Sequence, residues 1–155
     1  MNQMRHVIVG VSLAAGLAFN SAWALDISAQ TNRLEAGSER GFCEKVLHGK
    51  LFSRTELFFG LSRSGGLPDV TEAQFQTFLD TEVTPRFPDG LTLLTGTGQF
   101  KNSGIIIQER SKLLILLYPF NQKSYGAVEE IRQAYKDAFQ QEGVLRVDEQ
   151  SCISF

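Results

Sequence analysis

The sequence predicts an α+β domain of the ferredoxin-like class, and two observations lead to that fold. Segments typical of strands and helices follow one another in the order strand, helix, strand, strand, helix, strand. This βαββαβ order is the split β-α-β unit. Right-handed crossovers then give a four-stranded antiparallel sheet in the order 4-1-3-2, with two helices on one face. Finally, two cysteines flank the unit, where this topology would bring its ends together.

The first 24 residues have the layout of a cleaved secretory signal peptide. Arg5 supplies a positive start, Val7–Phe19 is an uncharged run, and Ala22-Trp23-Ala24 places small residues where a signal peptidase reads. The run is too short to cross a bilayer as a stable helix; the alternative is an uncleaved N-terminal anchor. We expect cleavage after Ala24 and therefore a periplasmic or secreted protein with no integral membrane span.

Residues 25–41 are polar and lack an apolar period, so we interpret them as a flexible leader before a single domain over 42–155. The apolar residues of Phe42–Leu51 fall on one side, which predicts a short helix. Thr55–Ser62 is rich in aromatic residues and predicts the first strand, which the glycine-containing turn at 63–66 closes.

The next helix has a strong start signal. Thr71 and Gln74 have the spacing of a capping box, and Val70 can pack on Phe75 as a hydrophobic staple. Pro85 should end this helix, because the residue before a proline avoids helical angles.

A proline-glycine turn at 87–90 leads to two strands joined by a hairpin. We expect a bulge in the second strand, where glycines interrupt the pattern. We also expect a break in the third strand, which is otherwise apolar on both alternating faces and therefore central. The predicted segments are a second strand Leu91–Thr95, a bulge Gly96-Thr97-Gly98, a hairpin tip Lys101–Gly104, and a third strand Ile105–Glu109 and Lys112–Tyr118 with its break at Arg110-Ser111.

Pro119 and Asn121 open the second long helix, which Gly143 should end as its left-handed C′ residue. Val144–Asp148 is the predicted fourth strand and runs on towards Cys152. Because this strand should be antiparallel to the first, Cys152 should lie near Cys43. In an oxidising compartment the pair is expected to form a disulfide, with two free buried thiols as the alternative.

Composition excludes several classes of function. The formal net charge is −2 at pH 7 and no Lys/Arg cluster is present, which argues against a nucleic-acid partner. His48 is the only histidine after signal cleavage, and neither HExxH nor CxxC occurs, so no cofactor or metal is expected. The run Gly60–Ser64 half-resembles a nucleophile elbow, but its final glycine is missing, and we interpret Ser62 as a turn serine.

Several stretches of the chain resemble the bacterial domain-of-unknown-function family 3574. The resemblance implies one compact, exported domain and transfers no activity to any residue. Gly143 departs from it, because a small polar residue, usually Ser, is expected there. The matching stretches are Thr55–Leu61, Thr84–Thr92 with the string TPRFPDGLT, Glu109–Lys112 and Tyr135–Val147.

Charged residues are the candidate ligand contacts. We expect the two central strands to be parallel, which would bring Glu56 and Lys112 to one edge of the sheet with Arg146 on the flanking strand. Together with Glu109 they could hold a small anionic ligand or perform acid/base work; an ion-pair network that sets the sheet register is the favoured alternative. Arg86, between two prolines, would clamp a carboxylate or bind helix-end carbonyls.

The sheet has apolar residues on both faces, while two helices can cover only one. Either the segment Phe42–Phe52 or a second subunit should cover the other. The sequence therefore favours a binding or interaction module, homodimeric through its open sheet face and without chemistry of its own. The alternative is a cofactor-independent enzyme or small-molecule-binding protein with a pocket between the sheet and its cover.

Overall fold

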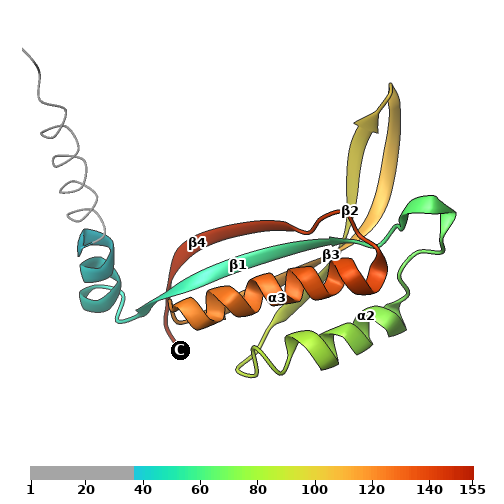
Figure 1. Cartoon of the computed structure of the whole chain (residues 1–155). Coiled ribbons are helices and arrows are strands. Elements are labelled where there is room, and N and C mark those ends of the chain that lie inside the picture. The colour runs from blue at the N-terminus through green and yellow to red at the C-terminus, as the bar shows by residue number, and fades with distance from the viewer. Residues whose placement is uncertain (1–36) are drawn as a thin grey trace, which may run out of the picture. The chain divides into compact units, whose positions relative to one another are not determined.

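The computed structural model describes residues 37–155, of which 39–155 form one compact unit (Figure 1). The predicted signal peptide and residues 25–36 of the predicted leader lie outside the described residues. Among residues 37–155, no helix has the length and apolar character needed to cross a membrane.

The domain is α+β, with one antiparallel sheet of four strands. The strand order β2-β3-β1-β4 is the predicted order 4-1-3-2 read from the opposite edge. The strands are β1 (Lys50–Gly60), β2 (Thr92–Asn102), β3 (Ile105–Tyr118) and β4 (Leu145–Ile153), and the two long helical regions are α2 (Glu72–Phe78), continued by η2 (Leu79–Val83), and α3 (Gln122–Phe139).

The two central strands are antiparallel, which corrects the expectation that they are parallel. The right-handed crossover through α2 makes β1 and β2 run the same way. The short hairpin after β2 then sends β3 back between them, so β3 must oppose both neighbours. Residue pairs such as Glu56 with Ile115 and Phe59 with Lys112 define this register.

The β2–β3 hairpin is regular over its whole length. Thr92 faces Ile115 and Asn102 faces Ile105 with no slip between, so the predicted bulge at Gly96–Gly98 and the predicted break at Arg110-Ser111 are both wrong. The predicted tip is confirmed: Ser103 and Gly104 both have positive φ, as a two-residue hairpin turn requires. The tight turn fixes the register of the hairpin. Continuous pairing of the two strands then keeps that register past Gly96 and Gly98.

The start of the domain differs from the prediction. Residues 37–45 are helical, so this helix begins inside the segment that we interpreted as a leader and ends before the predicted limit at Leu51. His48, with φ of 52°, reverses the chain, and β1 starts at Lys50 rather than Thr55.

Helix α2 begins as predicted. The Thr71 side chain accepts a hydrogen bond from the Gln74 backbone, and the Gln74 side chain accepts one from the Thr71 backbone. Val70 and Phe75 are both buried, as the staple requires. The helix continues into the wider turn η2, where the Thr84 N–H donates to the Leu79 carbonyl, and ends before Pro85.

Helix α3 also starts as predicted, with the Asn121 side chain accepting a hydrogen bond from the Ser124 backbone. It ends earlier than predicted. Gln140, with φ of 56°, takes the left-handed position that we assigned to Gly143. The Gln141 side chain donates to the Ser62 carbonyl, which links this helix end to the segment just after β1.

Both helices pack on the same face of the sheet. Residues of β1 and β3 alternate between buried and less buried positions, and the buried set meets the apolar side chains of α2 and α3 in one core. Aromatic rings fill its centre: Tyr135 lies 4.6 Å from Phe59 and 4.8 Å from Phe139 between ring centroids.

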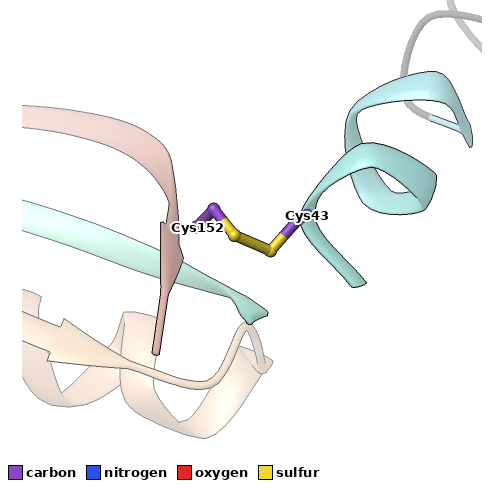
Figure 2. The surroundings of a disulfide bond; sticks show 2 residues. All are labelled: Cys43 and Cys152. Atoms are coloured by element: carbon purple, nitrogen blue, oxygen red, sulfur yellow. A yellow bond between two sulfur atoms is a disulfide. The ribbon is translucent and has the colours of Figure 1, made fainter. Parts of the chain in front are cut away.

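A disulfide joins Cys43 to Cys152, confirming the predicted pair (Figure 2). Cys152 pairs with Leu51 across β4 and β1, so the bond links the end of β4 to the segment just before β1. Gly49 passes so close to this link that a Cβ there would lie 2.7 Å from the Cys152 sulfur. The sequence separation of 109 residues encloses almost all of the sheet and both helices.

Candidate functional site: the open face of the sheet

The face of the sheet opposite α2 and α3 is rich in apolar side chains. Alternate residues of each strand lie on this face. In the two central strands they include Phe58 and Leu113, which face each other across the sheet. Side chains of this kind stay substantially solvent-exposed on all strands but β1: Leu94, Phe100, Ile107, Leu117, Leu145 and Val147. We call this surface the open face.

The N-terminal segment does not cover the open face. Phe42, Val46 and Leu47, the apolar residues that would have to pack on it, are themselves about half exposed. Figure 1 shows residues 39–45 of the short helix beyond the start of β1 and the end of β4 rather than over the sheet. Within the described part of the chain, the helix that precedes β1 therefore does not act as the predicted cover of this face.

Two hollows lie at opposite ends of the open face. The first, about 460 Å³, is lined by Phe58, Phe100 and Leu145, by Glu109, and by loop residues 140–143. The second, about 340 Å³, is lined mainly by apolar residues that include Phe52, Ile115, Leu117, Ile153 and Phe155. We call the second one the end groove. The end groove is concave and mainly apolar, which suits the binding of another molecule, whereas polar residues make up much of the lining of the first hollow.

Charges of both signs cross the middle of the open face. Arg54 on β1 forms ion pairs with Glu56 two residues along the strand and with Glu149 across on β4, at 2.6 Å in the second case. These ion pairs are partly exposed to solvent, where such pairs contribute little to stability. Glu56, a predicted ligand residue, therefore sits in a cross-strand ion-pair network.

Glu109 lies at the end of this face where β1 ends. Its Oε1 accepts a hydrogen bond from the Ser62 backbone N–H at 3.1 Å. Gly60 makes room for this carboxylate, because a Cβ on Gly60 would collide with Glu109 Oε1. Of the five predicted ligand residues, Glu109 is the one that lines the 460 Å³ hollow.

The structure does not bring the predicted ligand residues together. The expected meeting of Glu56 and Lys112 is wrong, since the antiparallel register pairs Glu56 with Ile115 and puts the two side chains on opposite faces. Arg146 pairs with Leu57 and so also lies on the helix face. The error follows directly from the assumed parallel strands.

Lys112 is buried beside the start of α2, with 3% of the residue exposed. Its Nζ donates to Glu72 at 2.6 Å and to Thr95 at 2.8 Å. The hydrogen bond from Lys112 lowers the pKa of Glu72, and the nearby charge of Arg110 adds to the effect. The amine thus joins β3 both to α2 and to β2.

Arg86 binds a helix-end carbonyl, the second of the two roles predicted for it. Its guanidinium donates to the Glu82 carbonyl oxygen at 2.6 Å and pairs with the carboxylates of Glu82 and Glu130. These bonds tie the end of η2 to α3. Binding to a helix-end carbonyl is the alternative that the sequence left open.

Arg146 belongs to a polar network beneath α3 that the sequence did not reveal. Thr55 Oγ1 donates to Asp148 at 2.6 Å and lies 2.6 Å from the Tyr118 hydroxyl. Because Thr55 has one proton, the Tyr118 hydroxyl is the donor of the second bond. Arg146 then bonds Asp148 and Glu129. A signal was present: polar Ser53 and Thr55 continue the alternation of buried Leu57 and Phe59.

These contacts shift the pKa values of the network in opposite directions. Burial raises the pKa of Tyr118, although its bond to Thr55 works against the shift. Burial also acts to raise the pKa of Asp148, but hydrogen bonds from Arg146 and Thr55 outweigh it and the pKa is lowered. The network is a neutral tyrosine next to a charged, paired aspartate. Around it, residues 37–155 contain no group of three or more His, Cys, Asp or Glu placed to hold a metal ion.

The family of the chain follows from its sequence. Residues 54–155 match the family described as "Protein of unknown function (DUF3574)". The chain belongs to this family. The match confirms the resemblance drawn from the TPRFPDGLT string and covers all four strands from β1 onwards except the start of β1. No curated protein matches the sequence.

Three solved structures are similar to this chain at low sequence identity. A phage SAM lyase in complex with S-methyl-5'-thioadenosine matches with a TM-score of 0.50 and 17% identity, over 67% of this chain and 90% of the lyase. The apo phage SAM lyase matches with a TM-score of 0.47 and 16% identity, over 66% and 90%. An amidase of the hydantoinase/carbamoylase family from Burkholderia multivorans has a TM-score of 0.30 and 14% identity, over 65% and 27%. At 17% identity, the likeness to the phage SAM lyase complex concerns the fold alone.

Proposed function

We propose that the chain is an exported binding module of ferredoxin-like fold, whose open face docks on a second copy of itself. The observation that carries this proposal is the row of exposed apolar side chains along a complete sheet face, which residues 37–155 leave uncovered. Contiguous apolar surface of this kind on a folded domain marks an interaction site.

The second copy is favoured as the occupant because the face can complement itself. It carries a basic group, Arg54, beside two acidic groups, Glu56 and Glu149. A two-fold axis brings the same patch of both copies together, so each Arg54 can approach a carboxylate of the other copy. The predicted signal peptide and the disulfide support export, since disulfides persist in oxidising compartments.

Sedimentation equilibrium of the mature chain tests this proposal. The wild type should show a concentration-dependent dimer. Leu145→Lys, at a position 62% exposed on the open face, should weaken the dimer at least about tenfold, because two-fold symmetry doubles each introduced charge. Leu67→Lys is the matched control, since Leu67 is also exposed but lies in the loop before α2. A wild type that stays monomeric at every concentration would refute the proposal.

A second candidate is small-molecule binding in the 460 Å³ hollow, because it combines the aromatic walls of Phe58 and Phe100 with the Glu109 carboxylate. A dimer partner on the open face would cover it. Thermal-shift screening of a metabolite library distinguishes this reading from a pure interaction module, since a bound ligand raises the melting temperature by mass action. The shift should shrink in Phe100→Ser and persist in Arg86→Ala, whose side chain does not line the hollow.

A further inference from the structure

The 460 Å³ hollow lies at a corner of the domain, where the β2–β3 hairpin leaves the body of the sheet. Pairing between β1 and β3 stops at Gly60 and Ser111, and beyond that point β2 and β3 pair only with each other. Figure 1 shows the hairpin turned away from the direction of the body strands. Both sides of this corner line the hollow, because Phe58 and Leu145 come from the body strands and Phe100 comes from the hairpin. Its volume is within the range of small-molecule sites, about 300–1,000 Å³.

Glycines keep side chains out of this corner. Gly60 and Gly96 are the two neighbours of Ser111 in the register, and Gly98 faces the next open-face residue of β3, Glu109. A Cβ on Gly60 would collide with the Glu109 carboxylate. A glycine inside a strand weakens the strand, and it often marks a place where a ligand approaches the backbone closely. Three glycines around one carboxylate therefore favour a binding site here.

Glu109 is the charged group that the β strands place in this corner. Its Oε1 accepts a hydrogen bond from the Ser62 backbone N–H at 3.1 Å, whereas its Oε2 accepts none from residues 37–155. No basic side chain of these residues forms an ion pair with Glu109. A carboxylate that is held in place through one oxygen and free at the other can bind a cation by a charge-assisted hydrogen bond.

The rest of the lining favours a cationic ligand over an anionic one. Arg63 and Glu142 are its other charged residues, so two carboxylates oppose one guanidinium. Arg63 is already engaged, since its Nε donates to the Pro68 carbonyl at 2.7 Å. An anionic ligand, which the sequence suggested, would meet this excess of negative charge. The aromatic walls, Phe58 and Phe100, attract apolar groups and also cations that approach the faces of their rings.

We propose that the hollow binds an organic ammonium ion with an apolar body. The positive group lies on the Glu109 carboxylate, and the body packs against Phe58 and Phe100. This inference rests on the second candidate function, small-molecule binding in the hollow, and adds the chemical class of the ligand.

Three probes with the same phenyl body test this class: the phenethylammonium cation, neutral phenethyl alcohol and the hydrocinnamate anion. Titrations followed by two-dimensional amide NMR at pH 7 measure the dissociation constants, at a protein concentration where sedimentation equilibrium shows the monomer. The cation should bind at least about tenfold more tightly than the alcohol, and the anion should bind more weakly than the alcohol. The amide signal of Ser62, which donates to Glu109, should shift with the cation.

Glu109→Gln tests the assigned carboxylate. It keeps an acceptor for the Ser62 N–H and removes the charge, so it should weaken binding of the cation at least about tenfold and change binding of the alcohol less than about threefold. Glu130→Gln is the matched control, because this exposed carboxylate lies on α3 and does not line the hollow. It should leave both dissociation constants unchanged. Circular dichroism and melting curves establish that each variant folds.

The outcomes separate this inference from the proposed functions. Equal binding of the cation and the alcohol, or a cation affinity that Glu109→Gln does not change, overturns the ammonium assignment while small-molecule binding in the hollow stands. Tighter binding of hydrocinnamate overturns it in favour of an anionic ligand. If no probe binds, the ammonium assignment falls, and the library screen still decides whether the hollow binds a small molecule. Self-association is measured separately by sedimentation.

Discussion

Tyr135 offers the sharpest test of how the core is built. Its ring is fully buried among Phe59, Phe78 and Phe139, and its hydroxyl donates to the Gly60 carbonyl at 2.8 Å. Tyr135→Phe keeps the ring and removes this one buried hydrogen bond. At pH 7 the loss should lower the free energy of unfolding by about 1–2 kcal/mol.

The same substitution should have a smaller effect at alkaline pH. Burial raises the pKa of Tyr135 above its ordinary value, and the negative charge of Glu109 raises it further. A raised folded-state pKa gives stability that is complete below the unfolded pKa, near 10, and is lost as pH rises above it. At pH 11 the wild type should have lost about 1.4 kcal/mol through this group alone. The penalty of Tyr135→Phe should therefore shrink almost to zero.

Urea unfolding followed by circular dichroism at pH 7 and pH 11 measures both values. Phe78→Leu, a core change without a titrating group, is the control, and its penalty should be the same at the two pH values. The chain holds two cysteines, both in the disulfide, so no free thiol can reshuffle it at pH 11. A Tyr135→Phe penalty that stays constant from pH 7 to pH 11 would refute the reasoning, because the hydroxyl would then ionise equally well in both states.

Three further predictions concern other parts of the domain. Replacing both cysteines by serine should lower the free energy of unfolding by no more than about 5 kcal/mol, the loop-closure value for a separation of 109 residues, as urea titration would measure; a larger loss would mean that the pair does more than close a loop. Asp148→Asn should flatten the acid limb of the stability curve, because the lowered pKa of Asp148 gives the wild type stability above pH 4 that disappears as pH falls through it; parallel acid limbs of the two proteins would contradict this. Thr71→Ala removes the capping box and should cost about 1 kcal/mol in thermal or urea unfolding, whereas Thr81→Ala, outside the cap, serves as the comparison.

Local signals in the sequence predicted local structure well. The Thr71–Gln74 capping box and the Asn121 cap each use a side chain to satisfy backbone groups within three residues, so neighbouring sequence is enough to identify them. The disulfide was also predictable, because Cys43 and Cys152 lie at chain positions that the strand order must bring together.

Strand direction and the placement of charges were harder to predict. Glu56 and Lys112 are separated by the sheet because the face of each residue depends on register, and one wrong direction moves every pair. The left-handed position at Gln140 was missed for a similar reason: Gln141 secures the helix end through a bond to Ser62, a residue distant in sequence. The position of the β2–β3 hairpin was predicted, but its unbroken length was not, because Gly96 and Gly98 suggested a bulge.

The disulfide has a consequence for how the protein withstands proteases that cut exposed loops. The tip of the β2–β3 hairpin, at Ser103-Gly104, is the kind of protruding turn at which proteolytic cleavage concentrates. A cut there falls inside the ring that Cys43 and Cys152 close, so the two fragments would remain one covalent molecule. The nicked chain would keep β1 hydrogen-bonded between β3 and β4, and the damage would appear only after reduction.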